Sequence, residues 1–324
     1  MRRAGAAAVV AALCIAAPRA AEAPPAASFA RPLSIPAPAD NPLTLAKADL
    51  GRRLFNDAFL SESGARACAS CHYPIQTFTD GLAKARAGGK ELKRNTPALW
   101  NLAWSTALFW DGRAASLEEQ ARTPLTSPDE MGRSLAEAAQ RIAARPSYAE
   151  DFARAFPDDP QITAANLARA LASYERSLVS PQTRFDRWAA ADAGALNASE
   201  TRGFALFTGA GGCAACHAGF AFTDSRLHQI GATDADPGAG AHTFRTAPLR
   251  ELLYTAPYLH DGSAATLEEA IAAHRGEAGA AQSLDAQARA DIIAFLTALS
   301  SPAPPVAAPP LDDAGVFVTH VTPR

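Results

Sequence analysis

Two copies of a five-residue motif constrain this chain more than any other feature. Residues 68–72 read Cys-Ala-Ser-Cys-His and residues 213–217 read Cys-Ala-Ala-Cys-His. The spacing C-x-x-C-H is typical of covalent haem c attachment. Two thiols one helical turn apart can form thioethers with the vinyl groups of one porphyrin, and the histidine that follows can then ligate the iron. We therefore expect two haem c groups, attached through Cys68, Cys71, Cys213 and Cys216, with His72 and His217 as iron ligands.

A C-x-x-C pair has two other common uses. One pair can form a redox-active disulfide, and two pairs can hold one zinc ion. Neither use requires a histidine directly after each pair. The remaining cysteine, Cys14, lies in the N-terminal segment, so an exported form of the chain would carry no cysteine outside the two motifs. Exported proteins usually hold structural disulfides, and this distribution therefore favours haem.

The N-terminal segment has the composition of a secretory signal. Arg2 and Arg3 precede an apolar run over residues 4–17, which small residues and proline follow. A charged, then an apolar, then a small-residue region predicts a signal peptide over residues 1–23 and a periplasmic protein. The alternative is an apolar first helix of the folded protein, but the run is short and wrongly flanked for one.

Charge and hydropathy exclude two classes of protein. The chain holds 30 Lys and Arg against 33 Asp and Glu, a formal charge of −3; loss of residues 1–23 removes three Arg and one Glu and leaves −5. No basic surface is thus available to hold nucleic acid. No uninterrupted apolar run reaches the ~20 residues that span a bilayer, so we expect no membrane-spanning helix.

The two motifs belong to a longer duplication. Residues 111–119 match residues 261–269 at a constant offset of 150, which indicates two related units. A Pro-rich stretch precedes the first unit, and a Pro/Ala-rich stretch follows the second. We expect a signal peptide (1–23), an N-terminal arm (24–42), an N-terminal haem domain (43–180), a C-terminal haem domain (181–300) and a tail (301–324).

Helical periodicity dominates outside the motifs. Apolar residues recur three and four positions apart in residues 44–55, 134–144, 164–178, 199–207 and 286–299. Ser116 with Glu119, and Thr266 with Glu269, predict a capping box at the start of a helix in each unit. Strand alternation is scarce. The sequence therefore predicts a mostly α fold, in which two tandem cytochrome c-like domains wrap long loops around their cofactors.

The two units differ where chemistry would take place. A haem that reacts with a small oxidant needs an open coordination position and a group that transfers protons. No histidine or methionine lies between His72 and Gln120, so no nearby residue of the usual kind can close the first iron. Glu130 can move a proton between the two oxygens of peroxide while Gln120 orients it. The alternative is that both are ordinary surface residues.

The second iron has several candidate ligands besides His217. Methionine is nearly excluded, because the only one after Met1 is Met131, which belongs to the first unit. The candidates are Tyr254, Tyr258, His260 and His274, while His228 and His242 lie in a Gly-rich loop.

Further segments between residues 43 and 299 carry a resemblance to one family. They are residues 94–97 (RNTP), 109–113 (FWDGR), 129–132 (DEMG) and 255–262 (TAPYLHDG). With them the chain resembles the bacterial di-haem cytochrome c peroxidases, a superfamily that includes the MauG-type enzymes. The resemblance implies that the N-terminal haem is the peroxidatic centre, with His72 as proximal ligand. It also implies that Gln120 and Glu130 line the distal pocket and that Trp110 is an electron bridge between the haems.

The resemblance also implies a calcium ion at the interface of the two domains. Its ligands would be the side chain of Asn95 and the carbonyl groups of Thr255 and Pro257, with water completing an oxygen shell. Relatives in the family are often dimers, so a homodimer is a further implication.

Two departures from the family pattern have consequences. Many of its peroxidases carry a histidine after the first motif that caps the peroxidatic iron, but residues 73–93 contain none, so we expect this haem to be open when fully oxidised. The same peroxidases ligate the second iron with a methionine fourteen residues after the His of the TAPYxH block, where MauG-type enzymes have tyrosine. Here that position is His274, which predicts bis-histidine ligation with His217 and a lower potential. A surface histidine is the alternative.

Three functions remain open on this sequence. We favour a periplasmic peroxidase that reduces hydrogen peroxide to water, with electrons from a small cytochrome c or copper protein bound transiently to the C-terminal domain. The second is a MauG-type enzyme that oxidises Trp or Tyr side chains of a partner protein. In it Trp100, Trp104 or Trp188 would relay charge, although each is also a core residue by type. The third is an electron carrier with two closed haems.

Overall fold

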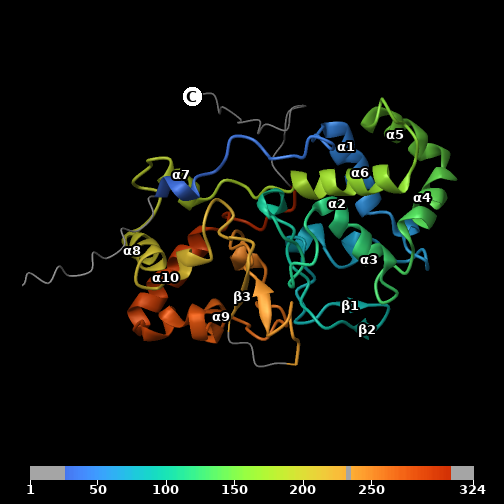
Figure 1. Ribbon diagram of the computed structural model, residues 1–324. Helices are drawn as coiled ribbons and strands as arrows, with labels where there is room; N and C mark the ends of the chain where they lie inside the picture. Colours follow the sequence, from blue (N-terminus) through green and yellow to red (C-terminus); the bar gives the residue numbers. More distant parts are fainter. Residues whose placement is uncertain (1–25, 231–234, 308–324) are drawn as a thin grey trace, which may run out of the picture.

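Helices carry most of the regular structure in the computed structural model, which describes residues 26–230 and 235–307 (Figure 1). The mostly α fold is confirmed. The signal peptide predicted for residues 1–23 lies outside the described residues, as does most of the predicted tail. The α-helices of the described part are α1 (Leu45–Phe55), α2 (Leu117–Gln120), α3 (Arg122–Thr126), α4 (Leu135–Ala143), α5 (Ala149–Ala155), α6 (Ala164–Ser177), α7 (Arg184–Ala189), α8 (Ala198–Thr208), α9 (Leu267–Ala273) and α10 (Ala286–Ala298).

Two short antiparallel ribbons make up the named strands of the described part. β1 (Arg86–Ala87) pairs with β2 (Lys90–Glu91), and β3 (Leu227–Gln229) pairs with β4 (Thr243–Arg245). β4 also reaches the N-terminal half, because the Arg245 N–H donates to the Trp110 carbonyl at 2.7 Å. None of the helices in the described ranges is long and apolar enough to cross a bilayer.

The duplicated helix starts are similar but not identical. At the start of α9, the Thr266 hydroxyl accepts from the Glu269 N–H (3.1 Å) and the Glu269 carboxylate accepts from the Thr266 N–H (3.2 Å), which completes the predicted capping box. At the start of α2, Ser116 accepts from the Glu119 N–H at 3.1 Å. The Glu119 carboxylate, however, accepts from the Ala115 N–H (2.8 Å), so the box predicted there is incomplete.

A glycine lies at the closest approach of the main helix pair in each half. α1 packs on α6, and α8 packs on α10. A Cβ atom at Gly51 would lie 2.0 Å from the carbonyl oxygen of Ala170, and one at Gly203 would lie 1.9 Å from that of Asp291. Only glycine permits backbones this close. The internal duplication therefore extends to the way the helices pack.

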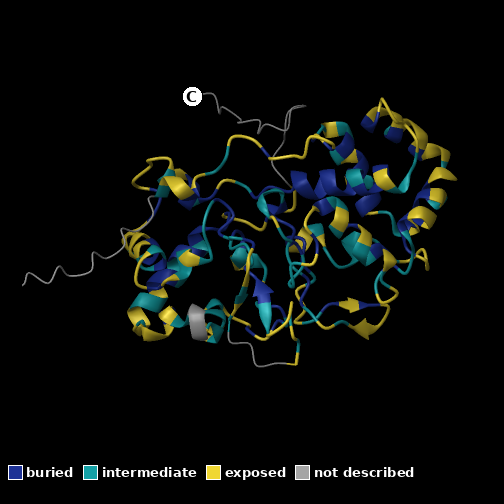
Figure 2. Ribbon diagram, in the orientation of Figure 1, coloured by how far each residue is buried: buried dark blue, intermediate teal, exposed yellow. Residues whose placement is uncertain are grey.

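Two large apolar cores lie along the chain. The first draws its residues from α1, α2, α4, α5, α6 and the segments between them, and Figure 2 shows α6 as the most deeply buried helix. The second is formed by aromatic and aliphatic residues of α7, α8 and α10 together with Phe29. Phe29, from the arm before the first haem motif, stacks on Phe222 with ring centres 5.0 Å apart. The predicted arm is thus partly a component of the second core.

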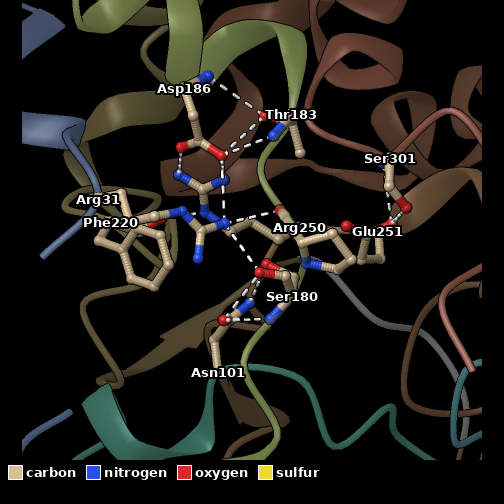
Figure 3. Close-up of polar contacts among 10 residues, drawn as sticks. Arg31, Asn101, Ser180, Thr183, Asp186, Phe220, Arg250, Glu251 and Ser301 are labelled. Atoms are coloured by element: carbon tan, nitrogen blue, oxygen red, sulfur yellow. Dashed lines mark hydrogen bonds and ion pairs between the residues drawn. The ribbon is translucent and has the colours of Figure 1, made fainter. Parts of the chain in front are cut away.

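A buried ion-pair cluster ties the arm and the segment after α6 to the second half (Figure 3). The Arg250 guanidinium donates to both oxygens of Asp186, at 2.8 and 3.1 Å, and both side chains are almost wholly buried. Arg31 adds a third contact to Asp186 at 3.2 Å and also donates to the carbonyl groups of Ser180 and Pro181. The arginines hold the pKa of Asp186 below its usual value against the opposing effect of burial.

Candidate active site

The first motif forms a single tight turn that presents its histidine inward. Residues Cys68–Ser70 are a 3₁₀ turn, and the His72 N–H donates to the Cys68 carbonyl at 3.0 Å. The Nδ1 atom of His72 lies 3.0 Å from the Phe78 carbonyl oxygen. A carbonyl can only accept, so Nδ1 carries the proton and Nε2 keeps the lone pair that a metal needs.

The second motif repeats this geometry. The His217 N–H donates to the Cys213 carbonyl at 2.9 Å, and Nδ1 of His217 lies 3.0 Å from the Phe222 carbonyl oxygen. Burial lowers the pKa of His217 to about 4, and nearby His274 adds to the effect. Burial also lowers the pKa of His72. Both rings are therefore neutral near pH 7, which is the form that binds iron.

The four motif thiols lack the features of a redox-active disulfide. None of Cys68, Cys71, Cys213 and Cys216 forms a disulfide with another cysteine of the described residues. Burial raises the pKa of Cys68 to about 12 and that of Cys71 to about 11, so these thiols are inert toward exchange in this environment. Each pair stands beside a neutral imidazole whose Nε2 is available. This donor set fits a covalently bound haem better than a redox disulfide.

A cavity of about 560 Å³ opens beside the first motif. This volume lies within the range of cofactor and ligand sites. Its wall, as far as described residues form it, contains His72 but no second histidine. Two buried oxygens in it, Oε1 of Gln120 and Oε2 of Glu175, have no hydrogen-bond partner among residues 26–230 and 235–307. Other lining residues are Cys68, Cys71, Arg94, Asn95, Trp110, Asp111, Arg113, Glu130, Asp236 and Arg245.

Gln120 and Glu130 line the same cavity as His72. Gln120 is the last residue of α2, and Glu130 lies in the turn after α3, where its N–H donates to the Ser127 carbonyl at 3.0 Å. Burial, aided by Asp129, raises the pKa of Glu130 above its usual value, while Arg113 opposes the shift. The carboxyl is thus better able to hold and release a proton near neutral pH than an exposed glutamate. Gln120 and Glu130 thus both lie, partly buried, in the wall of the cavity that contains His72.

Trp110 occupies the junction of the two halves. Its Nε1 donates to the Asn95 carbonyl at 2.9 Å, and its own carbonyl accepts from the N–H of Arg245 in β4. The Asn95 N–H in turn donates to the His260 carbonyl at 2.7 Å. Trp110, which lines the cavity, is therefore held through its ring by the first unit and through its backbone carbonyl by the second.

The segment around Asn95 is also where the resemblance implies calcium. The Asn95 side chain is buried, and its Nδ2 donates to the Leu82 carbonyl at 2.8 Å. The amide oxygen of Asn95 therefore faces away from that bond and remains an acceptor. The contact with His260 brings Asn95 close to the segment that carries Thr255 and Pro257, so an oxygen-lined site there is compatible with the fold.

Among the candidate ligands of the second iron, His274 lies beside His217. Their ring centres are 6.4 Å apart. Nδ1 of His274 lies 2.7 Å from the Ala270 carbonyl oxygen, which leaves Nε2 available. Two imidazoles that share one metal, with bonds of about 2 Å on either side, have ring centres roughly 6 Å apart. The observed separation fits that arrangement.

The other three candidates have different contacts. The Tyr254 hydroxyl donates to the Ser301 carbonyl at 2.7 Å, and the Tyr258 hydroxyl donates to the Leu252 carbonyl at 2.8 Å. The His260 ring stacks on Phe244 with centres 3.7 Å apart. The three tryptophans considered as relays pack against aromatic rings: Trp100 on Phe78, Trp104 on Phe220, and Trp188 on Phe185 and Phe204.

Sequence reasoning missed an ion-pair network in the cavity wall. Arg94 donates to both oxygens of Asp236, at 2.6 and 2.9 Å, and to Asp111 at 2.7 Å. Arg113 also pairs with Asp111. The hydrogen bonds from Arg94 hold the pKa of Asp236 far below its usual value. Since Asp236 belongs to the second half, the network joins the two units across the cavity.

Sequence comparison identifies two matching families. The family model described as di-haem cytochrome c peroxidase matches residues 45–194, and that described as di-haem oxidoreductase, putative peroxidase, matches residues 213–299. The methylamine utilization protein MauG of Methylorubrum extorquens is 43% identical over 297 residues, which cover 85% of this chain and 84% of that protein. The cytochrome c551 peroxidase of Pseudomonas aeruginosa is 32% identical over 302 residues, which cover 87% and 86%.

Structural comparison agrees. The crystal structure of a MauG-like protein associated with microbial copper homeostasis superimposes with a TM-score of 0.77 at 31% identity, over 86% of this chain and 97% of that one. Together the matches show a haem-dependent oxidoreductase. Within that class, the chain belongs to the di-haem cytochrome c peroxidase and MauG family, whose cofactor is haem c. The resemblance noted in the sequence is confirmed.

Proposed function

We propose that this protein is a peroxidase that reduces hydrogen peroxide to water with electrons from a small redox protein. The observation that carries the proposal is the shared cavity of His72, Gln120 and Glu130. It combines a neutral imidazole, a carboxyl whose pKa burial raises, and an amide oxygen without a hydrogen-bond partner in the described part of the chain. Cys68, Cys71 and His72 would hold the first haem, which supplies the iron at which peroxide is reduced.

The protein residues then handle protons. Glu130 takes a proton from peroxide and returns it to the departing hydroxyl, which leaves as water. Gln120 orients peroxide through its amide group. The full reaction consumes one peroxide, two electrons from the donor and two protons from solvent, and forms two waters. Trp110, held by both halves, lies where electrons would pass from one unit to the other.

Cys213, Cys216 and His217 would hold the second haem, with His274 as its sixth ligand. The ring separation of 6.4 Å supports this assignment. Two imidazoles favour ferric iron more than an imidazole and a thioether, so the potential of this haem would be low. In this proposal electrons from the donor enter at the second haem and reach the first cavity by way of Trp110.

Several further features belong to this proposal. A calcium ion at Asn95, Thr255 and Pro257 would join the two halves, and Asn95 already contacts that segment. The distinct apolar cores support haem domains at residues 43–180 and 181–300. Export to the periplasm through the signal peptide at residues 1–23, and assembly as a homodimer, complete the proposal.

A stopped-flow experiment tests the function. Fully oxidised protein is mixed with peroxide and a reduced small cytochrome c. We expect oxidation of the cytochrome without prior reduction of the enzyme. Glu130→Gln should slow turnover by about 10² or more. Glu91→Gln, a change of an exposed carboxylate on the cavity rim, should not. Absence of reaction, or turnover unchanged in Glu130→Gln, contradicts the proposal.

A second function is favoured by one observation, the 43% identity to a MauG protein. On this reading the protein uses peroxide to oxidise Trp or Tyr side chains of a partner. The same experiment separates the two functions. A long-lived oxidised haem spectrum that does not decay in the presence of the reduced cytochrome would support the MauG-type function. An electron carrier with two closed haems would not react with peroxide, and its reduced form would not bind carbon monoxide.

A further inference from the structure

Three arginines of the described residues are at most 5% exposed, and one of them differs from the others. Arg250 forms a two-pronged ion pair with Asp186, and Arg176 pairs with Glu118 at 2.9 Å. Arg245 has no ion pair with any residue in the described ranges. Its Nε donates to the Phe109 carbonyl at 3.0 Å and its Nη1 to the Thr246 carbonyl at 3.3 Å, both neutral groups.

A buried guanidinium without an anion is unfavourable. Taking the charge out of water has a large desolvation cost, which neutral carbonyl groups offset only in part. Arginine cannot avoid this cost by losing its proton near pH 7. Burial lowers the pKa of Arg245 to about 10, which still leaves the side chain charged. The surroundings of Arg245 therefore favour the binding of an anion beside its guanidinium.

The position of Arg245 indicates which anion this is. The residue ends β4 of the second half and lines the cavity beside His72, Cys68 and Cys71 of the first half. Arg94 lines the same wall, but Asp236 and Asp111 already neutralise it. The porphyrin that the two cysteines would attach carries two propionate carboxylates, and a guanidinium matches a carboxylate in geometry and charge.

We propose that Arg245 is the counter-ion of a propionate of the haem in this cavity, so that a residue of the second half sets the reduction potential of the first haem. The inference rests on the proposed haem attachment at the first motif. A fixed positive charge favours the added electron of the reduced state and thus raises the potential. The backbone N–H of Arg245 also donates to the Trp110 carbonyl, so the residue that carries this charge also lies at the junction of the two halves.

Spectroelectrochemical titration of the holoprotein tests the inference. At a fixed electrode potential near its midpoint, Arg245→Gln should lower the ratio of reduced to oxidised first haem at least tenfold, a shift of about 59 mV. Lys93→Gln removes one positive charge from an exposed residue of the same wall and should change the ratio less than threefold. A shift in Arg245→Gln no larger than that in Lys93→Gln overturns the inference.

Two further measurements separate this inference from the proposed function. The intact mass and the pyridine haemochrome spectrum count the attached haems. Wild-type protein without haem at the first motif overturns both the proposed function and this inference. Two attached haems, with a first-haem potential that Arg245→Gln leaves unchanged, overturn this inference alone. Arg245→Lys keeps the charge but lacks the planar fork. It should keep the reduced-to-oxidised ratio within threefold of wild type and shift the propionate band in the resonance Raman spectrum. An unshifted band overturns the inference even if Arg245→Gln does not fold.

Discussion

The imidazole of His274 lies 6.4 Å from that of His217, centre to centre, and the two ring planes are inclined by 59°. Each ring directs its Nδ1 to a backbone carbonyl of its own segment, Ala270 for His274 and Phe222 for His217. Both Nε2 atoms are thereby left for a shared ligand. In a chain that belongs to a di-haem family, this pair is the strongest geometric support for a closed second haem.

Substitution of His274 tests that pairing. His274→Met should raise the potential of the second haem by more than about 59 mV, which is a tenfold change in the reduced-to-oxidised ratio. The physical reason is that a thioether stabilises ferric iron less than an imidazole does. The measurement is a spectroelectrochemical titration, with electron paramagnetic resonance to follow loss of the bis-histidine signal. His242→Gln, in the loop before β4, is the control, and an unchanged signal in His274→Met would remove His274 as ligand.

Glu175 predicts a specific dependence of stability on pH. Burial raises the pKa of Glu175 to about 8, from 4.5 for an ordinary glutamate. Between these two values the native state holds a proton that the unfolded state has released. The free energy of unfolding therefore falls as pH rises through this window, by up to about 1.4 kcal/mol per pH unit from this group, and levels off above pH 8.

Urea unfolding of the holoprotein at pH 5 and pH 8 measures this effect. Glu175→Gln removes the titrating group, so its free energy of unfolding should fall less between the two pH values than that of wild type. Glu150→Gln, an exposed change in α5, should retain the wild-type dependence. Equal slopes for wild type and Glu175→Gln would show that Glu175 is already ionised in the native state.

The close helix contacts predict a matched pair of destabilised variants. In Gly51→Ala and Gly203→Ala the new methyl group meets a backbone carbonyl that cannot move without displacing a helix. Each change should destabilise the protein by about 1–3 kcal/mol or more, seen as a lower Tm. Gly194→Ala is the control, because the nearest atom to its added Cβ is the Asp192 carboxylate at 3.7 Å. A wild-type Tm for either buried variant would contradict the packing described.

Features with a local pattern were predictable from the sequence. The helices predicted at residues 44–55, 164–178 and 286–299 agree with α1, α6 and α10 to within one residue at each end. Helical periodicity and capping residues are read over a few neighbouring positions, and tertiary packing reinforced them here. The haem motifs were predictable for the same reason, because both thiols and the imidazole lie within one turn of the chain.

Features that depend on distant contacts were not predictable. Arg245 and Asp236 lie in the second unit but line the cavity of the first, and nothing in their neighbours along the chain indicates it. Glu175 follows the helical pattern of α6 without any sign that its carboxyl is buried. The incomplete capping box at Ser116 shows the same limit on a smaller scale. The backbone conformation before the helix determines that the Glu119 carboxylate accepts from the N–H of Ala115 and not from that of Ser116.

Phe29 provides the last prediction. The residue is 1% exposed, and its ring contacts those of Phe185, Phe204 and Phe222. Phe29→Ala should destabilise the protein by about 3–5 kcal/mol, because it leaves a cavity in a closely packed aromatic core.

The carbonyl of Phe222 orients His217, so the loss of Phe29 should also disturb the second haem before the first. Thermal unfolding followed at the absorption of each haem measures both effects. Leu33→Ala changes an arm residue that is 87% exposed and should leave both transitions in place. If Phe29→Ala behaves like Leu33→Ala, the arm does not contribute to the second core in solution; if both haems shift together, the two halves unfold as one cooperative unit.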